Sequence, residues 1–121
     1  MSHAKLELVF KSGQGCLAEY VRVPATHVAP RPADMKPTEA AGLAYAGLTA
    51  YQAIFTNAGL EAGQSLFING GSTTVGLYAM QMAKALGCKV AVSASAKREA
   101  FLRTMGVDEA SSCTFSNSVL D

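Results

Sequence analysis

A glycine-rich segment at residues 70–76 carries the groups best suited to chemistry in this 121-residue sequence. Its sequence is Gly-Gly-Ser-Thr-Thr-Val-Gly, and it lies between an apolar run at 65–69 and an amphipathic run at 74–86. Amides at the start of a helix have no partner within the helix, and the helix dipole favours an anion beside them. The segment is therefore a candidate phosphate-binding turn, whose residues are Gly71, Ser72, Thr73, Thr74, Val75 and Gly76.

The glycine pattern of this turn is incomplete. A G-x-G-x-x-G dinucleotide motif would have its middle glycine where Thr73 stands. We expect Gly71 to form the tight turn and Gly76 to let the helix approach the strand closely. The hydroxyls of residues 72–74 can donate to phosphate oxygens or can cap the helix. A phosphate site and a turn without a ligand therefore both remain open on these residues alone.

Ser95, Lys97 and Arg98 follow the next predicted strand, at residues 89–93. NAD sites place an acidic residue roughly 20 residues after the glycines, and no Asp or Glu occurs between Gly70 and Arg98. Two cations in the first turn of a helix oppose its dipole. A bound 2′-phosphate explains them, whereas solvated surface cations are the alternative. Together with the glycine turn, these residues favour NADP as the cofactor.

The elements that must position these residues follow the order strand, glycine turn, helix, strand, helix. Strands are predicted at 65–69 and 89–93, and a third strand could begin at 110–115. A helix is predicted from Thr74 to Leu86, ended by Gly87. Its apolar stripe holds Val75, Ala79, Met82, Ala83 and Leu86.

A second helix is predicted from Ala96 to Met105, with Phe101, Leu102 and Met105 facing inward and Gly106 ending it. Together these elements indicate the opening of a parallel sheet with right-handed crossovers.

The sequence before residue 58 indicates different elements. Residues 1–32 favour short strands separated by turns, one of them at 16–23, and four prolines then break up the connection. Thr38 is a candidate N-cap, with Glu39 at the positive end of a helical stretch at 40–57. Two glycines, Gly42 and Gly47, could divide that stretch into two pieces.

Composition excludes several classes of protein. The chain is 16% charged with a formal net charge of +1, which argues against a surface built for nucleic acid or anionic lipid. Its three cysteines are far apart, and neither histidine has another ligand at metal-binding spacing. No segment predicts a secretion signal or a membrane span. We therefore expect no metal and a cytoplasmic location.

Five segments resemble the medium-chain dehydrogenase/reductase superfamily, in its zinc-free quinone oxidoreductase and enoyl reductase branch. The resemblance covers roughly residues 13–110, in the family's order. The segments lie at residues 15–21, 46–53, 63–72, 81–87 and 106–109.

This resemblance implies an α/β fold: a partial Rossmann domain preceded by a remnant of a GroES-like β-barrel. The expected domains are the barrel remnant and linker at 1–37 and the first half of the nucleotide-binding domain at 38–121. It implies that residues 71–76 hold the pyrophosphate, that Ser95 with Lys97 or Arg98 faces the adenosine phosphate, and that Thr49 lies near the nicotinamide. The implied reaction is hydride transfer from NADPH to a quinone or an enone.

The sequence also departs from that family. Tyr45 stands where zinc-dependent relatives place a ligand cysteine, and the four-cysteine structural lobe is missing. The chain reaches only the first side of a six-stranded sheet, so the strand at 66–69 becomes an open edge that could pair two copies. We expect a fragment of an enzyme, and a non-catalytic nucleotide-binding or protein-interaction module is the second hypothesis.

Overall fold

The chain divides into two units, Met1–Met35 and Lys36–Asp121. The computed structural model describes residue 17 and residues 19–112. In the described part of the first unit, the one regular element is a 3-10 turn, η1 (Ala25–His27). The strand predicted at 16–23 is absent from residues 17 and 19–23. A strand needs a neighbouring backbone to bond its amides and carbonyls, and no strand is described in this unit to supply one.

A parallel sheet forms the second unit, with its strands in the order β1–β2–β3. The strands are β1 (Ser65–Asn69), β2 (Lys89–Ala94) and β3 (Glu109–Ser112). This confirms the predicted sheet, and β1 has its predicted bounds. The predicted third strand begins one residue earlier than expected, and its residues 113–115 lie outside the described part of the chain.

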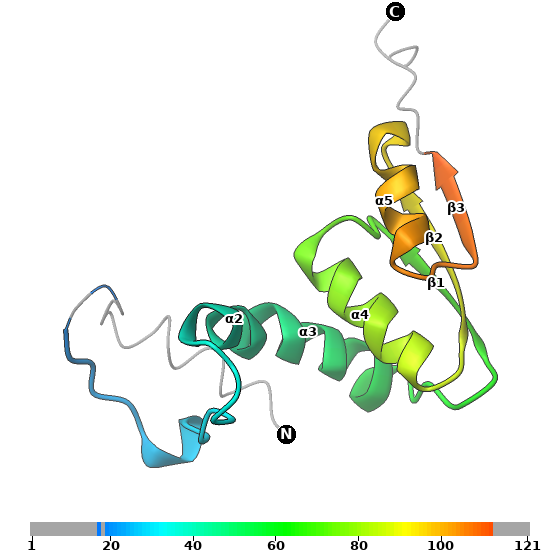
Figure 1. Ribbon diagram of the computed structural model, residues 1–121. Helices are drawn as coiled ribbons and strands as arrows, with labels where there is room; N and C mark the ends of the chain where they lie inside the picture. Colours follow the sequence, from blue (N-terminus) through cyan, green and yellow to red (C-terminus); the bar gives the residue numbers. More distant parts are fainter. Residues whose placement is uncertain (1–16, 18, 113–121) are drawn as a thin grey trace, which may run out of the picture. The chain divides into compact units, whose positions relative to one another are not determined.

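Crossover helices connect the strands. The helix α4 (Thr74–Ala85) joins β1 to β2, while η4 (Ala96–Arg98) and α5 (Glu99–Thr104) join β2 to β3. Figure 1 shows α4 and α5 on the same face of the sheet. Parallel strands joined in this way form a partial Rossmann fold.

A helical segment from Pro37 to Asn57 precedes the sheet. It alternates between α and π geometry, as α2 (Pro37–Gly42), η2 (Leu43–Gly47), α3 (Leu48–Tyr51) and η3 (Gln52–Asn57). The predicted N-cap, Thr38, is wrong, since the cap is Lys36. Pro37 takes the first helical position because its missing N–H has no partner there anyway. The Glu39 carboxylate accepts the Lys36 amide at 3.1 Å.

Gly42 and Gly47 make room for a side chain of α4 and do not interrupt the helical backbone. A Cβ at Gly42 would lie 3.2 Å from the Tyr78 hydroxyl oxygen, and one at Gly47 would lie 3.8 Å from the Tyr78 ring. These small residues therefore let the helical segment pack closely on α4.

Two apolar clusters hold this unit together. The larger cluster lies between the sheet and its crossover helices and includes Met80, Val92 and Leu102. The smaller one joins Ala50 and Ile54 of the helical segment to Ala79 of α4. Because α4 is packed on two sides, Met80 is fully buried although it lies outside the predicted stripe.

The second predicted helix is partly wrong. Its first turn is the 3-10 turn η4, and such a turn shifts the phase of the residues that follow. Leu102 is therefore buried as predicted, whereas Phe101, predicted to face inward, is 43% exposed. No helix in the described residues is long and apolar enough to cross a membrane.

Candidate nucleotide-binding turn

The glycine turn begins directly after β1 and is anchored to β2. Gly70 has a φ of +79°, in the left-handed region that favours glycine. The amides of Gly70 and Gly71 both donate to the Ser93 carbonyl, at 3.1 and 2.8 Å. The left-handed turn position is thus Gly70, and the prediction that gave this role to Gly71 is wrong.

Close packing explains the other two glycines. A Cβ at Gly71 would lie 2.6 Å from the Cβ of Val92, and a Cβ at Gly76 would lie 2.5 Å from the Gly70 carbonyl oxygen. Either methyl group would force the backbone to move. Gly76 therefore lets α4 start against the turn, as predicted, while Gly71 lets the turn lie on β2.

Thr73 is the N-cap of α4. Its hydroxyl accepts the Gly76 amide at 3.1 Å and donates to the Gly70 carbonyl at 2.8 Å. Of the two roles that the sequence left open for this hydroxyl, capping is the one that the structure shows.

The free donors of the turn lie on either side of Thr73. Among the described residues, the amides of Ser72, Thr74 and Val75 have no acceptor. The hydroxyls of Ser72 and Thr74 make no hydrogen bond there either. Three amides and two hydroxyls at the positive end of a twelve-residue helix can bind an anionic group.

A polar network behind the turn was missed in the sequence. The Ser93 side chain is 9% exposed. Its hydroxyl donates to Asn69 Oδ1 at 2.6 Å and accepts the Gly70 amide at 3.2 Å. Ser93 and Asn69 are partners in the sheet register. The one sequence signal was a serine near the end of an otherwise apolar strand.

The second predicted group, Ser95 with Lys97 and Arg98, follows the carboxyl end of β2. Ser95 lies two residues beyond Ser93, which anchors the turn, and its carbonyl accepts the Arg98 amide at 2.8 Å. The carboxyl ends of parallel strands lie at the same end of the sheet. Ser95 and the glycine turn, which follow β2 and β1, therefore lie at that same end. The cations Lys97 and Arg98 belong to η4, which precedes α5, and not to the first turn of the α-helix as predicted.

Lys97 and Arg98 are exposed. Neither forms an ion pair with any described residue, whereas the nearby Glu99 carboxylate pairs with Arg103 at 2.8 Å. The two cations are therefore available to an anion at this edge.

Thr49, the third predicted group, belongs to helix α3. Its hydroxyl donates to the Tyr45 carbonyl at 2.8 Å, within the same helical segment. The Tyr45 side chain is 59% exposed. Thr49 is thus half-buried with its hydroxyl bonded to its own helix.

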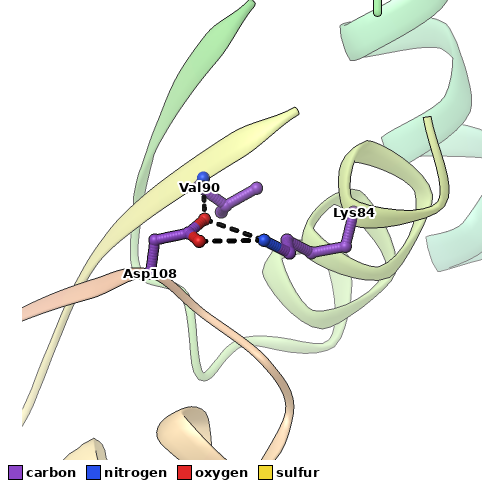
Figure 2. Close-up of polar contacts among 3 residues, drawn as sticks. All are labelled: Lys84, Val90 and Asp108. Carbon is purple, nitrogen blue, oxygen red and sulfur yellow. Dashed lines mark hydrogen bonds and ion pairs between the residues drawn. The ribbon is translucent and has the colours of Figure 1, made fainter. Parts of the chain in front are cut away.

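Asp108 lies at the amino-terminal end of the strands, opposite the glycine turn, and holds that end of the sheet together (Figure 2). Its carboxylate accepts the Val90 amide at 2.6 Å and pairs with the Lys84 ammonium at 2.9 Å. These contacts lower the pKa of Asp108 from 3.8, the Val90 amide having the larger effect and Lys84 the smaller. Asp108 thereby fixes β3 against β2 and α4. No group of three or more metal-ligating side chains occurs in the described residues.

Comparisons with known proteins come from sequences and from solved structures. No family model matches the chain. It is 38% identical over 100 residues to the mitochondrial NAD(P)H oxidoreductase RTN4IP1 of Danio rerio, covering 79% of this chain and 26% of that protein. It is 37% identical over 94 residues to the trans-enoyl reductase pgmF of Aspergillus terreus, covering 78% of this chain and 26% of that protein.

Solved structures agree with these relatives. The quinone oxidoreductase from Thermus thermophilus, solved also as its complex with NADPH, matches with a TM-score of 0.74 at 33% identity, over 83% of this chain and 34% of that one. The CurK enoyl reductase matches with a TM-score of 0.67 at 26% identity, over 73% and 26%.

The chain spans about a quarter of the length of the curated relatives it matches. Both comparisons point to the same group of enzymes as the five segments of the sequence. Over the residues that it shares with them, the chain is homologous to quinone oxidoreductases and enoyl reductases of the medium-chain dehydrogenase/reductase superfamily.

Proposed function

We propose that this chain is the nucleotide-binding part of an NADPH-dependent oxidoreductase that reduces a quinone or an enone. The observation that carries the proposal is the set of free amides at Ser72, Thr74 and Val75, between two glycines that packing requires. The names of the relatives support a nicotinamide cofactor, since they are NAD(P)H oxidoreductases and reductases.

The turn fits a pyrophosphate by its shape and its donors. A side chain at Gly71 or Gly76 would displace the backbone that forms the turn. Glycine at both positions lets the turn pack on β2 and lets α4 start against the turn. The amides of residues 72, 74 and 75 have no acceptor among the described residues, and such amides bind phosphate oxygens. In the proposed complex, the hydroxyls of Ser72 and Thr74 add two further donors, and Thr73 holds the turn in shape.

The choice of NADPH over NADH rests on the residues that follow β2. Ser95 would donate to the 2′-phosphate, and Lys97 and Arg98 would neutralise its charge. No acidic side chain follows β2 before Glu99, so nothing there accepts a ribose 2′-hydroxyl as in NAD sites.

NADPH, when bound, supplies the hydride that the acceptor receives. The residues of this chain bind and orient it: the turn holds the pyrophosphate and the second group holds the adenosine end. By resemblance, we propose that Thr49 lies near the nicotinamide. With Tyr45 in place of a ligand cysteine, we propose a reaction without zinc.

Nucleotide titration tests this proposal. We expect the chain to bind NADPH more tightly than NADH, measured by nucleotide fluorescence and by calorimetry. Lys97→Ala with Arg98→Ala removes the charge-assisted contacts of two exposed, solvent-screened cations, worth about 1.5–3 kcal/mol together. The NADPH Kd should therefore rise by at least roughly 10- to 100-fold, and the NADH Kd should stay the same.

The control is Lys89→Ala, which removes an exposed cation from the other end of β2. Its NADPH Kd should match that of the wild type. Equal binding of NADPH and NADH by the wild-type chain would contradict the NADP assignment, and absence of binding to either would contradict the site.

A non-catalytic module is the second candidate. Quinone-dependent NADPH oxidation separates the two functions. Oxidation above a protein-free blank supports the enzyme, whereas binding without oxidation supports the module. A cytoplasmic location, and no interaction with nucleic acid or membrane, stay predictions.

A further inference from the structure

Hydrogen bonds hold the first residue of the glycine turn, Gly70, on both of its sides. The Gly70 amide donates to the Ser93 carbonyl at 3.1 Å and to the Ser93 hydroxyl at 3.2 Å. The Gly70 carbonyl accepts the Thr73 amide at 3.0 Å and the Thr73 hydroxyl at 2.8 Å. Both polar groups of this glycine are therefore bonded within the protein, and its orientation is fixed.

The amides of the turn divide into bonded and free ones. Those of residues 70 and 71 are bonded to Ser93 on β2, and those of residues 73 and 76 are bonded within the turn. The free donors, at residues 72, 74 and 75, lie between these bonded groups along the chain. Their directions therefore follow from the orientation of the backbone that Ser93 holds.

The polar residue at position 93 needs partners because its side chain is buried. The preceding residues of β2, at 90–92, are Val-Ala-Val. A buried hydroxyl costs free energy unless it is hydrogen-bonded, and an alanine would avoid this cost. The Ser93 hydroxyl accepts the Gly70 amide and donates to Asn69 Oδ1 at 2.6 Å. Its two bonds to the end of β1 and the start of the turn explain why a serine fits here.

Asn69 sets the direction of this hydroxyl. A serine hydroxyl has one hydrogen, and that of Ser93 is directed to Asn69 Oδ1. A lone pair of the same oxygen is thereby turned toward the Gly70 amide. Asn69 is the partner of Ser93 in the sheet register, so the pairing of β1 with β2 brings the two side chains together.

We propose that Ser93 is a positioning residue for the pyrophosphate of the cofactor, and that Asn69 orients its hydroxyl. The inference rests on the proposed function. Ser93 acts on the ligand through the backbone of Gly70 and Gly71, from which the direction of the free amides follows. Donors that are already in place lose less entropy when a ligand binds. Without the hydroxyl, the same amides should therefore bind pyrophosphate less tightly.

Titrations of Ser93→Ala with NADPH, NADH and inorganic pyrophosphate test the proposal. The loss of one net hydrogen bond corresponds to a change of roughly 3- to 10-fold, so all three Kd values should rise by that factor. Ser93→Thr keeps the hydroxyl and should keep the wild-type Kd values. Ser111→Ala makes the same change at the register partner of Ser93 in β3. Among the described residues, Ser111 makes no hydrogen bond to the turn, and this control should also bind like the wild type.

Adenosine 2′-monophosphate separates positioning from a general loss of folding. It carries no 5′-phosphate, so in the proposed complex it meets only the group that follows β2: Ser95, Lys97 and Arg98. Its Kd should be the same for the wild type and for Ser93→Ala, at a temperature where circular dichroism shows both proteins folded. A parallel rise in this Kd would mean that the variant is disturbed as a whole, and would overturn the positioning role.

A double-variant cycle tests Asn69. Asn69→Ala should raise the same three Kd values, and adding it to Ser93→Ala should raise them no further. Effects of the two changes that multiply would overturn the role of Asn69. If the wild type binds NADPH and Ser93→Ala binds it equally well, this inference is wrong and the proposed function stands. A wild-type chain that binds no nucleotide would overturn both.

Discussion

The glycines of the turn and those of the preceding helical segment differ in what an added methyl group would meet. At Gly71 it would meet Val92 at 2.6 Å, whereas at Gly47 the nearest atoms lie 3.8 Å away, at ordinary contact distance. The φ of neither residue is positive. The same substitution at the two positions therefore has effects of opposite sign.

We predict that Gly71→Ala destabilises the protein by about 1–3 kcal/mol through overpacking. Gly47→Ala should stabilise it by about 0.5–1 kcal/mol, because alanine loses less backbone entropy in a helix. Urea unfolding measures both. In a Val92→Gly background, which removes the Val92 Cβ as well, the cost of Gly71→Ala should shrink, and an unchanged cost would contradict the contact as its cause.

Asp108 gives a prediction on pH. Its pKa is lowered in the folded state, so it stabilises the fold above its unfolded pKa of about 3.9. That contribution is lost as the pH falls from this value through the lower folded pKa. Wild-type stability should therefore drop through this acid range.

The Asp108→Asn variant has no such titration. Its unfolding free energy should be lower than that of the wild type at neutral pH, and it should depend less on pH below about pH 4. Urea unfolding from pH 7 down to pH 3 measures this. Parallel curves for the two proteins would show that Asp108 does not couple folding to pH.

Single-residue roles were predictable only where sequence position determines them. Gly76 follows from its place in the turn. Lys97 and Arg98 follow from their place directly after the second strand, and both are exposed. The buried network of Ser93 and Asn69 depends on which strand pairs with which, and in which register. No local pattern carries that information.

Helix α4 and its cap give a prediction for a whole element. Thr73→Ala removes the N-cap and should cost about 1 kcal/mol of stability, whereas Thr73→Ser should retain most of it. The neighbouring Thr74 makes no side-chain hydrogen bond to a described residue, so Thr74→Ala should change stability by less than about 0.5 kcal/mol. Thermal unfolding compares the three variants, and a larger loss for Thr74→Ala would contradict the cap.

Helices and strands with a clear pattern of apolar residues were predicted from the sequence. Features that depend on contacts with distant parts of the chain were not. The strands β1 and β2 and helix α4 follow from local patterns of apolar residues. The π geometry at 43–47 lies beside Gly42 and Gly47, on which Tyr78 packs, and no local pattern marked this segment or the π segment at 52–57. The expected strand at 16–23 depends on distant neighbours, because strand propensity is realised only in a sheet.

Ligand binding should stabilise the whole chain if the proposed function is right. A ligand that binds only the folded state stabilises it by RT ln(1 + [L]/Kd), or about 2.7 kcal/mol at 100 times the Kd. For a domain of this size the Tm should rise on the order of 10 °C with NADPH. The same concentration of NADH should raise it less, and an equal rise would oppose the role given to Lys97 and Arg98.

The Ser93 carbonyl accepts both the Gly70 and Gly71 amides. These two hydrogen bonds couple the opening of the glycine turn to the opening of strand β2. The start of the loop cannot leave the end of β2 without breaking both of these hydrogen bonds. Amide hydrogen exchange at these two glycines will therefore follow the slow opening of the strand and not the fast fluctuation of a surface loop.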